Sequence, residues 1–202
     1  MSDPRPAATK NRIRRGEASR ARTRRRTGRQ TIVFAAPPAI TATTAVGGPQ
    51  EGQGNLGDRL DVVYQDRLLG EKSWERAECQ MLCDAVEMVC RKGGYALSDI
   101  DMLVAGDLLN EIITSNFAAR QLDIPYLGVF GACSALTEAM GMAAMIVDGG
   151  YGDRVVAAVS SHHDTAERQY RFPTEFAVQR PPSAQWTVTG AGAVLVEPGD
   201  GA

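Results

Sequence analysis

The stretch Phe130-Gly131-Ala132-Cys133-Ser134-Ala135 decides the fold class. It follows an apolar run over residues 126–130 that is typical of a β-strand, and it precedes an Ala- and Met-rich run over residues 136–147 with helical spacing. Small residues at such a strand-to-helix turn let the backbone bend tightly and lift the central side chain out of the sheet, as at a nucleophile elbow. We therefore predict a strand, a turn that carries Cys133, and a helix, in that order.

Strand and helix patterns alternate on both sides of this turn. Ser73 is a candidate N-cap for a long helix that Gly93 and Gly94 end, and a short helix is expected over residues 115–120. Further strands are expected over residues 30–36, 100–105, 154–159 and 186–196, and residues 41–57 are expected to form a loop because they are rich in Gly, Thr and Pro. This alternation predicts an α/β fold, a mostly parallel sheet with helices on both faces.

Polar residues gather where three of the predicted strands end. In a parallel sheet these ends share one edge, at which ligands bind. The candidate ligand-binding residues are therefore Asp107, Asn110, Cys133, Ser134, Ser160, His162 and His163.

Cys133 is the candidate nucleophile. The dipole and unpaired N–H groups of a helix N-terminus favour a thiolate and would equally hold an oxyanion or a ligand carboxylate. His162 or His163 would be the base for such a thiol. The spacing is also compatible with a small buried cysteine beside a turn, and with a solvated loop in which the two histidines and Asp164 hydrogen-bond locally.

Three further patterns have a structural explanation and a functional one. Cys79, Cys83 and Cys90 fit the apolar stripe of the long helix, which favours core packing over a metal site, and we predict neither a metal nor a cofactor. Gly190-Ala191-Gly192 lies inside a strand pattern, so it indicates close backbone approach more than a nucleotide site. The arginines of the Pro-interrupted stretch over residues 165–185 would pair with an anionic ligand or remain surface charge; they are Arg168, Arg171 and Arg180.

The charge of the chain is divided unevenly. The 202 residues have a formal net charge of −2, yet 11 of the 22 basic residues and only two acidic ones fall within residues 1–30. This +9 segment has Ile13 as its only large aliphatic side chain, so it cannot bury enough apolar surface to become ordered. We predict a disordered basic tail over residues 1–30 and a folded half-domain over residues 31–202.

Composition also limits the partners and the setting. A nucleic-acid arm, an anchor to anionic lipid, a targeting peptide and a plain solvated extension are all compatible with the tail, but basic and aromatic residues are not interleaved elsewhere, so we expect no nucleic acid. The longest apolar run, residues 139–147, is too short to cross a bilayer, and no apolar core follows the basic N-terminus, so we expect no secretory signal. The four cysteines do not form a disulfide framework, which favours a reducing, intracellular setting.

Several long motifs, in order along the chain, resemble the stage V sporulation protein AD family. They include Gly70-Glu71-Lys72-Ser73-Trp74-Glu75, Gly106-Asp107-Leu108-Leu109-Asn110, Ser115-Asn116-Phe117-Ala118-Ala119-Arg120, Gly131-Ala132-Cys133-Ser134 and Trp186-Thr187-Val188-Thr189-Gly190-Ala191-Gly192. The resemblance runs from Thr31 to Val196 and implies the N-terminal half of a thiolase-like fold, whose proteins consist of two similar halves. We expect a truncated or split gene product, or a half that depends on a partner chain.

The resemblance also implies a function. The family binds dipicolinic acid (pyridine-2,6-dicarboxylate) and supports its uptake into the developing spore with membrane-embedded partner proteins, which would place the chain in the cytoplasm, peripheral at the spore inner membrane. The related condensing enzymes carry a nucleophilic cysteine at the position of Cys133. Three hypotheses follow: a non-catalytic dipicolinate-binding protein, a Cys-dependent acyltransferase of the thiolase type, and an interaction subunit that forms a homo-oligomer or pairs with a second half-domain chain.

Overall fold

The computed structural model describes residues 26–170, 183 and 185–199. The predicted tail lies outside the described residues except for its last five positions. The chain divides into two units, residues 1–33 and residues 34–202. In the first, β1 (Arg26–Thr27) and β2 (Thr31–Ile32) form a short antiparallel hairpin, so the strand expected over residues 30–36 is reduced to the two residues of β2.

The second unit is built on a six-stranded sheet with the order β4-β3-β8-β7-β5-β6. Five strands run in one direction, and β8 runs antiparallel to its neighbours β3 and β7. The predicted mostly parallel sheet is therefore confirmed. The strands are β3 (Ala39–Gly47), β4 (Val62–Val63), β5 (Met102–Asp107), β6 (Tyr126–Gly128), β7 (Val155–Ser161) and β8 (Gly190–Glu197).

The prediction of a loop over residues 41–57 is wrong for the first seven of these residues. Residues 41–47 belong to β3, which pairs with β8 from Ala39 opposite Glu197 to Gly47 opposite Gly190. Only the remainder is irregular, with the short helical turns η1 (Glu51–Gln53) and η2 (Gly57–Arg59). The turn-like composition was misleading because β-branched threonines suit a strand, and Ala42, Thr44 and Val46 alternate as its buried side.

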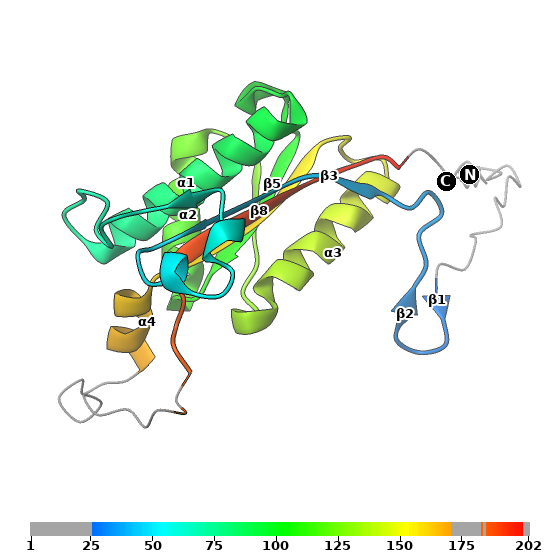
Figure 1. Cartoon of the computed structure of the whole chain (residues 1–202). Coiled ribbons are helices and arrows are strands. Elements are labelled where there is room, and N and C mark those ends of the chain that lie inside the picture. Colours follow the sequence, from blue (N-terminus) through cyan, green and yellow to red (C-terminus); the bar gives the residue numbers. More distant parts are fainter. Residues whose placement is uncertain (1–25, 171–182, 184, 200–202) are drawn as a thin grey trace, which may run out of the picture. The chain divides into compact units, whose positions relative to one another are not determined.

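Helices cover both faces of the sheet, as predicted. Figure 1 shows α1 (Trp74–Gly93) and α2 (Ile113–Leu122) on one face and α3 (Ala135–Asp148) on the other. The Ser73 hydroxyl accepts a hydrogen bond from the Arg76 N–H at 3.3 Å, and Gly94 ends α1 in the left-handed region, so both predicted caps of α1 are confirmed. The α1 and α2 face holds the larger of two apolar cores.

The cysteines of α1 belong to the larger core. Cys83 and Cys90 are buried beside Leu82 and Val86, and the half-buried Cys79 packs against the same cluster. Core packing, the structural explanation of this pattern, is therefore what the fold shows.

α3 is apolar on more sides than it buries. Its buried stripe, which recurs every four residues, is Ala135, Ala139, Ala143 and Val147. Glu138 and Asp148 are the only charged residues of this helix, while Met145 is exposed and Met142 is half-buried. One side of α3 is thus left with partly covered apolar side chains. No helix within the described residues has the length and apolar character that crossing a bilayer requires.

The central position of β8 gives the first prediction. Leu195 on β8 is fully buried between α1 and the sheet, so replacing it with alanine should lower the free energy of unfolding by about 3 kcal/mol because a cavity replaces its side chain. Leu56→Ala is the matched control: Leu56 is 72% exposed, and its loss should change the unfolding free energy by less than about 0.5 kcal/mol. Urea denaturation measures both, and equal effects would contradict the assignment of β8 to the core.

Candidate functional site

The turn around Cys133 has the strand, turn and helix that the sequence predicts. β6 ends at Gly128, the helical turn η5 (Ala132–Ser134) follows, and α3 begins at Ala135. Ala132 adopts a φ of 46°, which is unusual for a residue with a side chain. The Ser134 hydroxyl donates to the Gly131 carbonyl at 2.7 Å and closes the turn. The turn leaves Cys133 exposed at the start of α3.

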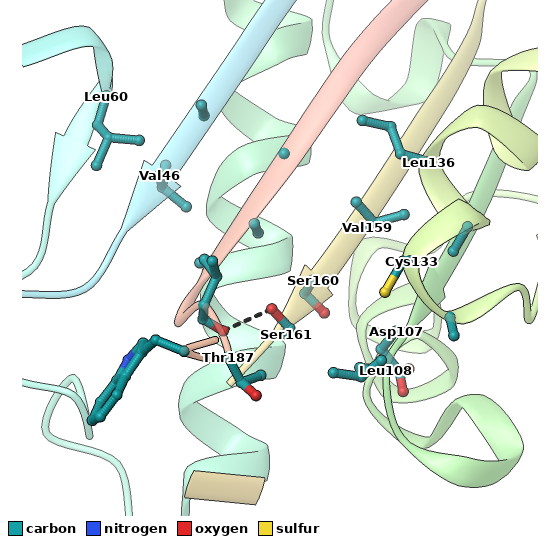
Figure 2. Close-up of a pocket in the computed structure, with 18 of the residues that line it drawn as sticks. Val46, Leu60, Asp107, Leu108, Cys133, Leu136, Val159, Ser160, Ser161 and Thr187 are labelled. Atoms are coloured by element: carbon teal, nitrogen blue, oxygen red, sulfur yellow. Dashed lines mark hydrogen bonds between the residues drawn. The ribbon is translucent and has the colours of Figure 1, made fainter. Parts of the chain in front are cut away.

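A pocket of about 650 Å³ opens beside Cys133. It lies at the carboxyl ends of β3, β5 and β7 and at the start of β8, which reaches the same edge because it runs in the opposite direction. Figure 2 shows Cys133 facing the end of β7, with Asp107 and Leu108 nearby. The lining side chains used below are Asp107, Cys133, Leu136, Val159, Ser160 and Trp186. The volume suits a small organic ligand.

Three of the seven predicted ligand-binding residues line this pocket: Asp107, Cys133 and Ser160. The other four, Asn110, Ser134, His162 and His163, are outside its lining. Asn110 is exposed, and its backbone N–H donates to Gln169 at 3.4 Å.

Asp107 serves the local backbone as well as the pocket. Its carboxylate is almost fully buried and accepts hydrogen bonds from the Leu109 N–H at 3.0 Å, the Ser115 N–H at 2.7 Å and the Ser115 hydroxyl at 2.8 Å. Burial raises the pKa of Asp107, and these hydrogen bonds oppose the rise. Asp107 therefore ties the end of β5 to the start of α2 and shapes this wall of the pocket.

Neither histidine lines the pocket with Cys133, and both have partners elsewhere. His162 is fully buried; its Nε2 lies 2.9 Å from the Arg67 carbonyl oxygen, and its Nδ1 accepts from the Asp164 N–H at 3.2 Å. Burial lowers the pKa of His162, so its neutral form is favoured. His163 stacks on Trp186 with ring centroids 3.8 Å apart, and its Nδ1 lies 3.2 Å from the Thr187 carbonyl oxygen.

Sequence reasoning missed Glu78, an acid beneath the pocket. Its side chain on α1 is fully buried, and its carboxyl oxygens lie 3.0 Å from the Ser160 hydroxyl and 3.2 Å from the Thr165 hydroxyl. Burial, with a smaller contribution from Asp107, raises the pKa of Glu78 to about 8. A signal was present: residue 78 falls between the two apolar stripes that predict burial of α1 on two sides.

The glycines of β8 have the structural role that the sequence indicates. A Cβ on Gly190 would lie 2.5 Å from the Val46 carbonyl oxygen, so only glycine lets β8 approach β3 this closely at the pocket. Arg168 is not available to a ligand in the pocket, because it pairs with Glu75 and lies over the Trp74 ring. The predicted anion partners Arg171 and Arg180 lie outside the described residues.

Comparison with known proteins identifies the family to which this chain belongs. The family model described as stage V sporulation protein AD matches residues 28–201. The chain belongs to the stage V sporulation protein AD family. It is 47% identical over 176 residues to the stage V sporulation protein AD of Bacillus subtilis (strain 168), an alignment that covers 86% of this chain and 52% of that protein. The chain thus spans about half the length of this relative.

Solved structures identify the fold of this family member as thiolase-like. A single-residue variant of OleA from Xanthomonas campestris matches with a TM-score of 0.57 at 15% identity, over 82% of this chain and 60% of OleA. The 3-oxoacyl-[acyl-carrier-protein] synthase III of Aquifex aeolicus VF5 matches with a TM-score of 0.55 at 15% identity, over 81% of this chain and 54% of the synthase. At these identities the likeness shows the fold alone.

The burial of Glu78 predicts a pH-dependent stability. Its folded-state pKa of about 8 lies above the ordinary value of 4.5, so between these values the folded protein keeps a proton that the unfolded chain has lost. The stability that this proton gives is complete below pH 4.5 and is lost as the pH rises to 8. Relative to Glu78→Gln, the free energy of unfolding should fall by about 1.4 kcal/mol per pH unit in this range and then level off.

Urea denaturation from pH 5 to pH 9 tests this. Glu87→Gln is the control because Glu87 is also on α1 but is half exposed and paired with Arg91, so this variant should follow the wild type. Parallel curves for the wild type and Glu78→Gln would show that Glu78 is ionised in the folded state.

Proposed function

We propose that this chain is a dipicolinate-binding component of the machinery that loads dipicolinate into the developing spore, and that it binds without catalysis. The observation that carries the proposal is a pocket that has the thiolase-like cysteine in its lining but neither histidine. Membership of the stage V sporulation protein AD family supports the role in sporulation.

The shape and chemistry of the pocket support a planar aromatic acid. Val159 and Leu136 provide apolar walls, and Trp186 offers an indole whose orientation is held by its stack on His163. A pyridine ring packs well against such a surface. The N-terminus of α3, at which Cys133 lies, provides the partial positive charge that favours a carboxylate.

The charge of the ligand needs a further source of compensation. Asp107 is acidic, and the described part of the pocket lining contains no lysine or arginine. A dipicolinate dianion would therefore depend on the α3 dipole, whereas its chelate with a divalent cation carries no net charge. Calcium therefore belongs in any binding experiment as a separate variable.

A Cys-dependent acyltransferase of the thiolase type is the alternative, and the exposed thiol of Cys133 at the start of α3 favours it. Acyl transfer also needs a base near the thiol. Neither His162 nor His163 lines the pocket, so the base would come from residues outside the described part of this chain or from a second chain.

We further propose that the membrane-embedded uptake proteins hold this chain at the spore inner membrane, and that the uncovered side of α3 packs against a like half-domain, from a second copy or another chain. The apolar side chains left partly exposed on α3 support such an interface.

Sedimentation of the wild type should show association that Met145→Asp removes, since a charge at this exposed methionine opposes burial. Two monomeric proteins would exclude the homo-oligomer.

Isothermal titration tests the binding function directly. Dipicolinate should bind the full chain at one site, with and without calcium, and isophthalate, which has the same carboxylates but no ring nitrogen, should bind more weakly. Trp186→Leu should weaken binding about tenfold because the pyridine ring of the ligand loses the aromatic surface against which it packs. Trp74→Leu is the matched control: Trp74 is the other of the two tryptophans and lies outside the pocket lining, so its loss should change the Kd less than about twofold.

The same titration separates the two functions. Acyl-CoA should give no heat if the chain only binds dipicolinate. Heat from acyl-CoA alone, together with acyl labelling that Cys133→Ser abolishes, would replace the binding proposal with the acyltransferase.

A further inference from the structure

Four polar side chains meet at the floor of the pocket, and the binding function does not explain one of them, Glu78. Asp107 and Ser160 line the pocket, whereas Thr165 and Glu78 lie below it and are fully buried. Glu78 is linked to the pocket through its hydrogen bond with Ser160. Among the described residues Glu78 has no cation partner, and a fully buried carboxyl group without one needs a physical account.

A proton on Glu78 supplies that account because it removes the buried charge, and the neighbouring hydroxyls allow it. Thr165 has one hydroxyl proton and two acceptors in reach, the His162 carbonyl oxygen at 3.0 Å and Glu78 Oε2 at 3.2 Å. When Thr165 donates to the closer carbonyl, the Glu78–Thr165 contact is a hydrogen bond only if Glu78 itself carries the proton. Glu78 Oε1 is then a carbonyl oxygen that accepts from Ser160 at 3.0 Å. The two hydroxyls can serve either protonation state, and the neutral form is favoured because Glu78 is fully buried and its partners in the described residues are hydroxyl groups rather than cations.

The neighbours of Glu78 agree with this assignment. Asp107 on β5 accepts three hydrogen bonds from N–H and O–H donors, so it is the ionised member of the two acids. Cys79, on the same helix as Glu78, opposes a charge on it, and β7 and α4 (His163–Tyr170) present the hydroxyls of Ser160 and Thr165. The raised pKa of Glu78 also favours its neutral form.

We infer that Glu78 is a neutral acid that admits an anionic, carboxylate-bearing ligand to the pocket, and that its ionisation excludes such a ligand. The inference rests on the proposed function in taking the ligand to be a carboxylate. Loss of the Glu78 proton would place a second negative charge beside that of Asp107, under the pocket floor at Ser160. Ligand binding and protonation of Glu78 are then linked: the anion binds the protonated form, and the proton is held more tightly in the complex.

Cys133 allows a test that does not depend on dipicolinate. Iodoacetate and iodoacetamide alkylate the same thiolate, but only iodoacetate brings a carboxylate into the pocket. The ratio of their rate constants at Cys133 therefore reports how well the pocket accepts an anion, and the ionisation of the thiol cancels. Trypsin cleaves after Arg120 and Arg154, so mass spectrometry separates Cys133 from the three cysteines of α1.

The iodoacetate-to-iodoacetamide ratio of the wild-type chain should fall on the order of fivefold between pH 7 and pH 9, the size of effect that one added charge has on another near a protein surface. In Glu78→Gln the ratio should stay constant and equal the wild-type value at pH 7. Glu87→Gln should fall with the wild type. His162 and Tyr126 keep one protonation state over this range, because burial lowers the pKa of His162 and raises that of Tyr126.

Dipicolinate titrations at the same pH values distinguish the two proposals. Binding that weakens above pH 8 in the wild type but not in Glu78→Gln supports both. A falling ratio without any dipicolinate binding supports the role of Glu78 and rejects the proposed ligand. A wild-type ratio that does not change with pH overturns the inference whatever dipicolinate does, and it requires no variant to fold.

Discussion

The antiparallel pairing of β8 with β3 on one side and β7 on the other is the interaction on which the rest of this structure depends. Residues 39–47 and 190–197 are far apart in sequence, yet their backbones pair along the whole of β3. Without β8 the sheet would separate into β4-β3 and β7-β5-β6, and the larger core would lose Leu195. Because β8 runs antiparallel, its first residue, Gly190, lies at the same sheet edge as the carboxyl ends of β3, β5 and β7. The start of β8 therefore completes the pocket.

The pocket combines features that belong to catalysis and features that belong to binding. The thiolase-like elbow presents Cys133 beside the N-terminus of α3, an arrangement that supports either chemistry. The histidines support the binding proposal, because one is hydrogen-bonded to backbone groups and the other is stacked on Trp186. The two acids at the pocket floor differ in a related way: Asp107 accepts three hydrogen bonds that stabilise a charge, whereas Glu78 is fully buried with two hydroxyl partners.

The fold likeness and the family membership carry different weight. OleA and the synthase III share an architecture with this chain at 15% identity, which leaves their reactions out of the argument. The Bacillus subtilis relative is much more similar, and its alignment covers 52% of its length. Within the described residues, the composition of α3 suits burial on more sides than its own sheet provides.

The sequence by itself determined the alternation of strands and helices, the caps of α1 and the turn at Cys133, because periodicity, Ser73, Gly94 and small residues act locally. It did not reveal β3, a threonine- and alanine-rich strand that is stable only when paired with a partner about 150 residues away. Only the tertiary structure decided which polar residues share the pocket. It joined Asp107, Cys133 and Ser160, placed Glu78 beneath them and paired His162 with the Arg67 carbonyl, since these relations depend on how distant elements pack and on which buried groups find hydrogen-bond partners.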